Sequence, residues 1–431
     1  MDALDAVQRP GIAAGSTTAA PLVLLGASVR ALGQSAACCG WQVHAADLFA
    51  DVDLVEVARE AIAVGAAGGV AVGPVAAAAY PWSLRAAAGR FPPGAAWCYT
   101  GALENHPDLI AAIAATRPLA GNPADAVRRL RDRRTVAAAA AAAGLAVPDT
   151  FDDPTGLPGD GTFLVKPVAG AGGRGIRPWT GAARAEEASP PAAVRAERMP
   201  RQWQRRIAGA PWSATFVFGG GGPRFVGVAR QLVGTAWCHA APFAWCGAVA
   251  ASARLPPPFA ATVARLGPPL AAESGGVGLV GVDLIVDDAG RVHVIEVNPR
   301  PTASMELFER TGDLALAADH LAACGFASPR PHRPCAAADA GATWSKAVLF
   351  ARHDTPLGED MIGALRAAGA AWTAADGGWP ALADLPRPAQ VLAAGGPVLT
   401  VFARGPAAAE SLAALRGRIA AVERLLRRFP P

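Results

Sequence analysis

The chain of 431 residues exceeds the usual size of a single domain, so two to four structural units are expected. Its hydrophobic share of 52% is rich in alanine, and no apolar run approaches the ~20 residues that a membrane span needs, so a soluble protein is expected. A formal charge of +4, spread over many arginines without a basic block, disfavours nucleic acid as a partner. The seven cysteines show neither a disulfide framework nor paired CxxC spacing, which favours a reducing, cytoplasmic location.

The first elements predict a doubly wound α/β unit over residues 21–120. It follows a short arm, residues 1–20, that lacks the features of a secretory signal. The run PLVLLGASVRALGQSAACCGWQVHAADLF reads as strand, glycine turn, helix and second strand, and residues 68–73 and 97–103 are predicted as later strands. The turn lacks the second glycine of a dinucleotide fingerprint, so NAD is disfavoured.

A helical tract rich in arginine and alanine follows. Asn122 is the predicted capping residue, with proline at the first helical position, and Gly144 ends the helix. Arg133 lies either on a solvated helix face or in a phosphate site, and the helical pattern alone favours the solvated face.

The next informative stretch joins a strand that carries Lys166 to a glycine-rich loop at residues 170–175. The glycines of this loop are Gly170, Gly172, Gly173 and Gly175. Glycine permits left-handed backbone angles and close approach, so consecutive amides can face the oxygens of a phosphate. Lys166 can add a positive charge to the same anion. No GK(S/T) sequence follows, so the loop is not a Walker A motif.

Antiparallel strands are predicted between residues 201 and 250, with a tight hairpin at the glycine run 219–222. Arg230 lies inside one of these strands and is expected either to face solvent or to meet an anion. The loop at residues 234–250 carries two cysteines and a histidine whose spacing disfavours a metal site. Its aromatic residues indicate either a wall over an organic substrate or plain packing.

Residues 278–300 predict a β-hairpin with acidic side chains on one face, because two β-branched runs flank the turn sequence DDAG. Glu296 and Asn298 are two residues apart, so a strand directs both to the same face. A turn of two or four residues adds Asp283 to that face, opposite Glu296 in the two-residue case, whereas a three-residue turn breaks this register. Such oxygen ligands suit Mg²⁺ shared with phosphates; the alternative is the solvated outer face of a sheet.

The composition changes again after this hairpin. Residues 327–341 form a proline-rich linker, and residues 342–431 are predicted to be a small β-rich unit that ends in an amphipathic helix. No chemistry is evident in this last unit.

The stretches LVKPVAGAGGRGI and GVDLIVDDAGRVHVIEVNPR together resemble the lysine, glycine-rich loop and metal-binding hairpin of the ATP-grasp superfamily. The trailing NPRPTASME is similar to the form in a group described as predicted ATP-dependent carboligases. The resemblance covers most of the chain and implies an α/β and α+β fold. Its parts are a Rossmann-like pre-ATP-grasp domain at 21–120, an ATP-grasp domain of two subdomains at 121–326, and the small C-terminal β-rich unit at 342–431.

The resemblance also implies roles for individual residues. Asp283, Glu296 and Asn298 would bind Mg²⁺, with Mn²⁺ as an alternative, and Lys166 and the loop would hold the phosphates of ATP. The strand expected to pass the adenine contains Gln204, Arg205, Arg206 and Ile207. Arg205 stands where the family usually has an acidic residue, and Arg133 replaces the family's upstream phosphate-binding lysine. The expected catalytic cations are Lys166, Arg230 and Arg300.

The chemistry that the resemblance implies is ligation. A substrate carboxylate attacks the γ-phosphate of ATP to give an acyl phosphate, and an amine then displaces phosphate to leave an amide. The carboligase group is similar to proteins of one-carbon carrier cofactor biosynthesis, of the methanopterin and methanofuran type. The alternatives are a nucleotide-binding regulatory protein without turnover, and acid–thiol ligation or carboxylation. The expected partners are a small-molecule carboxylic acid and an amine, with a homodimer left open, and neither nucleic acid nor a membrane.

Overall fold

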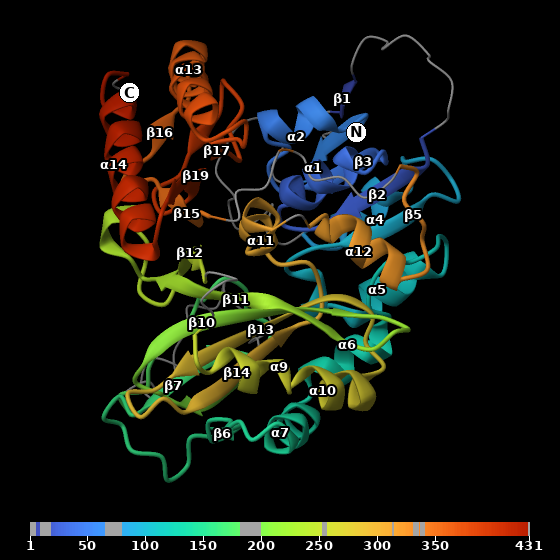
Figure 1. The fold of residues 1–431 in the computed structure, drawn as a ribbon, viewed down its shortest axis with the longest axis vertical. Helices are drawn as coiled ribbons and strands as arrows, with labels where there is room; N and C mark the ends of the chain where they lie inside the picture. Colours follow the sequence, from blue (N-terminus) through green and yellow to red (C-terminus); the bar gives the residue numbers. More distant parts are fainter. Residues whose placement is uncertain are drawn as a thin grey trace, which may run out of the picture.

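The computed structural model describes residues 6–8, 19–64, 80–181, 200–251, 257–312, 314–330, 336 and 341–429 (Figure 1). The predicted strand at residues 68–73 lies outside these ranges, as do most of the arm and most of the proline-rich linker. No helix in the described ranges is long and apolar enough to cross a membrane.

The N-terminal unit is built on a five-stranded sheet with the order β1-β4-β3-β2-β5, parallel except for β1. Its strands are β1 (Ala6–Gln8), β2 (Pro21–Leu25), β3 (Gln42–Asp47), β4 (Glu60–Ala63) and β5 (Ala96–Tyr99). Its helices are α1 (Arg30–Cys38), α2 (Val52–Val57), α4 (Ser83–Ala88) and α5 (Pro107–Ala114). Strands β2 and β5 are apolar throughout, as expected where helices bury both faces of a parallel sheet. The chain moves from β2 to one side and later returns to its other side as β5. Ligands usually bind at the carboxyl ends of strands at such a switch point.

The arginine- and alanine-rich tract forms two helices, α6 (Ala124–Arg131) and α7 (Arg133–Ala142). Asp132 is extended between them, and its carboxylate accepts the N–H groups of Arg134 and Thr135 at 3.0 and 2.9 Å, which caps α7. The side chain of Asn122 instead accepts a hydrogen bond from the backbone N–H of Val277 and donates one to the carbonyl oxygen of Pro299. The prediction of one helix capped by Asn122 is therefore wrong, because the Asp132 side chain offers the backbone a new helix start.

A small antiparallel sheet with the order β6-β9-β7-β8 follows. Its strands are β6 (Thr150–Phe151), β7 (Phe163–Pro167), β8 (Arg177–Pro178) and β9 (Arg201–Arg205). One face is apolar and carries the buried side chains of Phe163, Val165 and Trp203. Strand residues alternate between faces, so Lys166 and Gln204 project from the other face.

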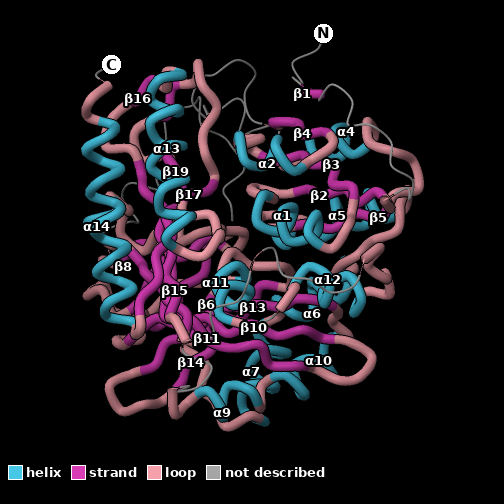
Figure 2. Tube along the Cα trace, turned by 45° about the horizontal axis from the view of Figure 1, so that its top comes forward, coloured by secondary structure: helices cyan, strands magenta, loops and turns pink. Residues whose placement is uncertain are grey.

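A long antiparallel sheet joins the middle and the end of the chain, with the order β14-β13-β10-β11-β12-β15-β19-β17. Its strands are β10 (Ala210–Phe218), β11 (Arg224–Val233), β12 (Trp245–Ala250), β13 (Gly278–Val286), β14 (Val292–Asn298), β15 (Thr343–Phe350), β17 (Leu382–Ala383) and β19 (Pro397–Gly405). The two parts meet where β12 pairs with β15, for example Gly247 with Ala347. The C-terminal strands thus extend the sheet of the hairpin, and they pack against α13 (Glu359–Ala375) and α14 (Ala408–Leu426) (Figure 2).

The two faces of this sheet have different neighbours. One face packs against α7, α9 (Ala260–Ala264) and α10 (Gly267–Ser274). The other face packs against α11 (Met305–Thr311) and α12 (Leu316–Ala323), which lie between the sheet and the N-terminal unit in both views (Figures 1 and 2). The second face therefore looks toward the switch point of the parallel sheet.

A buried ion-pair network joins the three parts of the chain. Arg30 in α1 donates to Asp384 at 2.9 Å and to Glu306 in α11. Lys346 in β15 donates to Glu306 at 2.6 Å. Burial alone would raise the pKa of Glu306, but the charges of Arg30 and Lys346 hold it well below its usual value. The network fixes the N-terminal and C-terminal units against α11.

Glu309 lies one turn further along α11, and its burial is expected to make the free energy of unfolding depend on pH. Burial raises the pKa of Glu309 from 4.5 to about 7. The folded state therefore keeps a proton that the unfolded chain loses, and the free energy of unfolding falls as pH rises from about 4.5 to about 7. Glu309→Gln should remove up to about 3 kcal/mol of this dependence between about pH 5 and about pH 8 in urea unfolding. The exposed Glu410→Gln is the control, and equal pH dependence in both variants would contradict the assignment.

The cysteines depart from expectation at one position. Cys39, Cys98, Cys238, Cys246 and Cys324 take part in no disulfide. Cys38, at the end of α1, is disulfide-bonded. The expectation drawn from cysteine spacing is therefore wrong for Cys38, because spacing along the chain does not report distance in the fold.

Candidate functional site

The hairpin of β13 and β14 brings Asp283, Glu296 and Asn298 to one face by a route that the sequence did not predict. The connection is a three-residue turn that ends at Gly290, whose φ is +78°, and this turn length by itself would break the register. Ile295 is an extra residue in β14, a β-bulge between the pairs Leu284–Val294 and Asp283–Glu296. The bulge restores the register, so Asp283 lies opposite Glu296 and Gly281 opposite Asn298.

The pair of opposed carboxylates creates a site that favours a cation. Asp283 Oδ1 accepts a hydrogen bond from Gln231 at 2.7 Å, and Oδ2 accepts one from Asn298 at 3.0 Å. Burial, followed by the negative charge of Glu296, raises the pKa of Asp283 from 3.8 to about 6. A hard divalent cation would relieve this repulsion, and the oxygen ligands fit Mg²⁺. No group of three or more His, Cys, Asp or Glu side chains able to hold a metal occurs in the described residues, so the Asn298 amide and substrate oxygens would complete such a site.

Arg131, which the sequence did not single out, connects this hairpin to the strand that leads into the glycine-rich loop. Its guanidinium donates to Glu296 Oε1 at 3.0 Å and to the carbonyl oxygen of Val168 at 3.3 Å. The break at Asp132 ends α6 directly after Arg131, so the two helices direct Arg131 and Arg133 to different places. The break itself was the signal in the sequence that would have separated the two arginines.

Lys166 lies on the polar face of the small sheet, where it is 7% exposed. Its ammonium group donates to Gln204 Oε1 at 3.0 Å, and Gln204 in turn donates to the hydroxyl of Thr150 at 3.3 Å. Arg133 donates to the backbone carbonyl of the same Thr150 at 3.3 Å. Gln204 and Arg133 therefore both bond Thr150, and Lys166 is joined to them through Gln204.

The remaining residues of the predicted adenine strand differ in their exposure. Arg205 is exposed, pairs with Asp149 at 2.9 Å and lies over the ring of Phe163. Arg206 is exposed and Ile207 is half-buried. Arg133 is also partly exposed and pairs with Asp152 at 2.5 Å. Arg205 therefore lies on the face of Phe163, opposite to the face that carries Lys166 and Gln204.

The glycine-rich loop is held in place from two sides. The side-chain amide of Asn105 donates to Gly170 O at 3.0 Å, and the backbone N–H of Trp245 donates to Gly172 O at 3.2 Å. The loop thus contacts both the N-terminal unit and the start of β12. Residues 243–245, part of the aromatic loop that the sequence left unassigned, form one wall against it.

Gly173 cannot be replaced without displacing this loop. Its φ is +78°, and a Cβ atom would lie 1.9 Å from the backbone oxygen of Phe243. Backbone strain of about 1–3 kcal/mol in Gly173→Ala should raise KM for ATP about 10-fold or more, measured by steady-state ADP release. Gly94→Ala is the matched control, because Gly94 has a φ of +74° with nothing within 4 Å. Equal KM values in the two variants would contradict a role for the seated loop.

Arg300 connects the hairpin to the N-terminal unit. It donates to Asn298 Oδ1 at 3.2 Å and to Glu104 Oε1 at 2.7 Å. Burial would lower the pKa of the Arg300 guanidinium, but the buried Glu104 carboxylate raises it above its usual value. Arg300 therefore stays charged beside the carboxylates, and its role as a catalytic cation stays a prediction.

Arg230, a predicted catalytic residue, projects away from the carboxylates of the hairpin. It is exposed and pairs with Trp212 and Val249 across the sheet. Its neighbour Gln231 bonds Asp283, so the alternation of the strand directs Arg230 to the opposite face. The structure brings Gln231, rather than Arg230, to the carboxylates.

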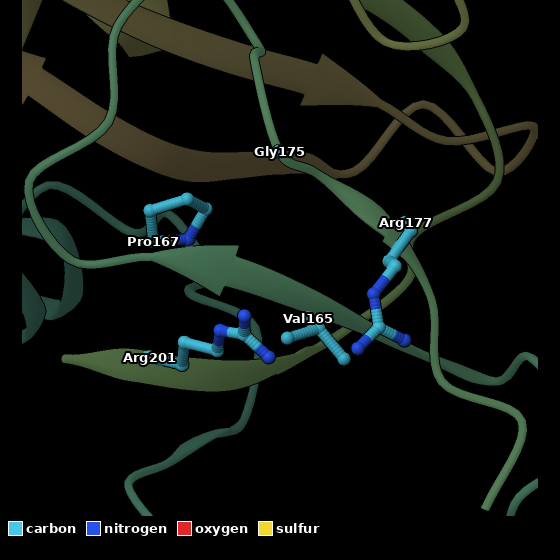
Figure 3. A pocket seen from close by; sticks show the side chains of 5 residues that line it. All are labelled: Val165, Pro167, Gly175, Arg177 and Arg201. Carbon is cyan, nitrogen blue, oxygen red and sulfur yellow. The ribbon is translucent and has the colours of Figure 1, made fainter. Parts of the chain in front are cut away.

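A cavity of about 380 Å³ lies behind the loop and is lined by Val165, Pro167, Gly175, Arg177 and Arg201. Figure 3 shows the guanidinium groups of the two arginines on either side of Val165. Val165 and Pro167 alternate with Lys166 along β7, so the cavity lies on the other side of this strand from the ammonium group. It borders the base of the loop but is separate from the cluster around Lys166.

Comparison with known proteins agrees with this arrangement. Residues 130–304 match the family described as the ATP-grasp domain. No curated protein matches the sequence. The match confirms the predicted ATP-grasp domain for residues 130–304, and the structure confirms the predicted mixed α/β fold.

Several solved structures share the fold over more than three quarters of the chain. Carboxyaminoimidazole ribonucleotide synthase from Aspergillus clavatus, complexed with ATP, has a TM-score of 0.62 at 13% identity and covers 94% of this chain and 99% of its own. N5-carboxyaminoimidazole synthetase from Staphylococcus aureus, complexed with ADP, has a TM-score of 0.60 at 14% identity, with 93% and 97% covered. The biotin carboxylase domain of Hydrogenobacter thermophilus 2-oxoglutarate carboxylase, crystallised as a dimer with MgADP, ADP and bicarbonate, has a TM-score of 0.56 at 17% identity, with 78% and 75% covered. At these identities the likeness shows the fold.

Proposed function

We propose that this protein is an ATP- and Mg²⁺-dependent ligase that joins a small-molecule carboxylate to an amine and releases ADP and phosphate. The observation that carries the proposal is the pairing of Asp283 with Glu296 on the face toward the N-terminal unit, joined through Arg131 to the strand of the glycine-rich loop. The ATP-grasp domain and the complexes of similar structures with ATP, ADP or MgADP support it.

The chain's own residues have distinct roles in this proposal. Asp283, Glu296 and Asn298 would hold Mg²⁺, which offsets the negative charge of the phosphates when bound. Lys166 and the backbone amides of the glycine-rich loop bind and orient the phosphates. Arg300, kept charged by Glu104, faces the transferred phosphoryl group. Arg230 has no role because it lies on the opposite face.

The proposed reaction has two steps. A carboxylate oxygen of the substrate forms a bond to the γ-phosphorus as the bond to the oxygen of ADP breaks, which leaves an acyl phosphate. The amine nitrogen then bonds the acyl carbon as the carbon–oxygen bond to phosphate breaks. One proton from the neutral amine leaves with the phosphate, so the products are an amide and hydrogen phosphate. No side-chain nucleophile is needed, so positioning and electrostatics carry the rate.

The direct test is a screen for ADP release against candidate acids and amines, including glutamate and furan and pterin precursors. ADP and phosphate release that needs both an acid and an amine is expected. Release of AMP and pyrophosphate would overturn the proposal. The precursors are included because the sequence after the hairpin resembles the carboligase group, for which one-carbon carrier cofactor biosynthesis is the proposed setting.

The second candidate is a nucleotide-binding regulatory protein that does not turn over. The intact carboxylate pair favours the ligase, because a cation site at the phosphates serves phosphoryl transfer. An Asp283→Ala, Glu296→Gln double variant is expected to abolish ADP release while the protein still folds. Unchanged release would remove the metal site from catalysis. Cytoplasmic location, a homodimer and the absence of a nucleic-acid partner remain predictions.

A further inference from the structure

Three buried polar atoms lie beside the proposed reaction centre without a hydrogen-bond partner within the described part of the chain. They are Tyr80 Oη, Glu104 Oε2 and Asn105 Oδ1. Glu104 is only 3% exposed, and its other oxygen is taken by Arg300. A buried polar atom without a partner costs about 1–3 kcal/mol, so these atoms are expected to serve a ligand.

The position of these atoms links both halves of the site. Glu104 and Asn105 follow β5, at the carboxyl end of the strand beside the switch point of the parallel sheet. Glu104 reaches Asn298 through Arg300, and Asn105 bonds Gly170 of the glycine-rich loop. Ala102, just before them, has a φ of +81°, a strained conformation for alanine that is typical of functional sites. Glu104 and Asn105 therefore lie where the N-terminal unit meets the proposed phosphoryl-transfer site, and Tyr80 packs against the apolar cluster that contains their neighbour Leu103.

The chemistry of these atoms selects the ligand. Asn105 must direct its Nδ2 to the Gly170 carbonyl, which fixes its Oδ1 as an acceptor. Glu104 Oε2 is an acceptor on a carboxylate. Burial raises the pKa of the Tyr80 hydroxyl, and the negative charge of Glu104 raises it further. Two acceptors, one of them negatively charged, repel a carboxylate ligand and attract the N–H groups of an amine.

We propose that Glu104, Asn105 and Tyr80 form the subsite for the amine substrate, a primary amine whose N–H groups donate to Glu104 Oε2 and Asn105 Oδ1. This assignment rests on the proposed ligase function and specifies which part of the protein recognises the second substrate. The carboxylic acid is held apart, on the side of Arg300 and Asn298. The adjacent Glu104–Arg300 ion pair places the amine next to the acyl group that it attacks.

The test compares amine recognition with the earlier step in the same variants. Glu104→Gln keeps an oxygen for Arg300 but presents N–H groups to the amine, and Tyr80→Phe removes one hydroxyl without touching Arg300. With the acid and amine that give the fastest ADP release from a panel of amino acids, both variants should raise KM for the amine about 10-fold or more. KM for ATP and for the acid should stay within about twofold. In Tyr80→Phe, whose hydroxyl has no contact with Arg300, hydroxylamine added in place of the amine should still trap the acyl phosphate as a hydroxamate at the wild-type rate at saturation. The exposed Asp108→Asn is the control.

The outcomes separate the two proposals. If the wild-type protein forms hydroxamate and couples amines but Tyr80→Phe and Glu104→Gln leave KM for the amine unchanged, the subsite is wrong and the ligase function stands. If KM for the acid rises instead, these residues bind the acid and the assignment is reversed. If no acid supports ADP release or hydroxamate formation by the wild-type protein, the ligase function fails and the subsite fails with it.

Discussion

Replacing Glu296 with glutamine should lower kcat for ADP release about 10²-fold or more. The change removes one of the two opposed carboxylates but keeps an oxygen that can accept from Arg131. The Mg²⁺ concentration that gives half-maximal rate should rise, because the site loses one negative charge. Steady-state ADP release, measured as a function of Mg²⁺ at saturating ATP, checks both effects.

Folding provides the control for this prediction. The charge of Glu296 raises the pKa of Asp283, so its removal relieves repulsion and should leave the thermal midpoint equal or higher. Glu273→Gln, an exposed change in α10, should alter neither the midpoint nor the rate. A Glu296→Gln protein that keeps the wild-type kcat and Mg²⁺ dependence would show that the hairpin does not bind the catalytic metal.

Replacing Lys166 with methionine should lower kcat by about 10²-fold or more and raise KM for ATP. Methionine preserves much of the buried stem but removes the ammonium group that is proposed to meet the phosphates. Gln204 loses its partner at 3.0 Å, so a loss of up to about 1–3 kcal/mol of stability accompanies the change.

The rate and the stability must be measured on the same preparation. Urea unfolding reports the cost of the lost hydrogen bond, and ADP release at saturating ATP reports the lost charge. Arg265→Met, an exposed cation whose side chain bonds only Thr262 among its described contacts, is the matched control. A rate that falls no further than the control's would remove Lys166 from the proposed phosphate site.

The sequence was most informative where strand alternation and glycine patterns act locally. It predicted the strands of Lys166 and of the hairpin, and the paired faces of Glu296 and Asn298, because period-two alternation needs no tertiary information. It could not predict that the C-terminal strands join the same sheet as the hairpin, since the pairing of β12 with β15 spans about a hundred residues.

The composition of the site was harder to predict for the same reason. Gln231 and Glu104 reach Asp283 and Arg300 from other elements, and no local pattern distinguishes them from solvated residues. Arg230 was predicted as a site residue because a charged side chain inside a strand is uncommon. Adjacent residues of a strand face opposite sides of the sheet, so its neighbour Gln231 is the one that reaches Asp283. The helix break at Asp132 likewise depends on a side-chain cap competing with helix propensity.

Because of the bulge at Ile295, this hairpin can lose one residue at that position and still hold Asp283 opposite Glu296. Loss of Ile295 itself would leave Asp283 opposite Glu296, because the extra residue has no partner across the ladder. Loss of Val297, with the bulge kept, would place Asn298 opposite Val282 and turn its amide toward the apolar face. Homologous hairpins one residue shorter than this one can therefore carry the same acidic pair, and an alignment that forces a constant length between Asp283 and Glu296 would misplace it.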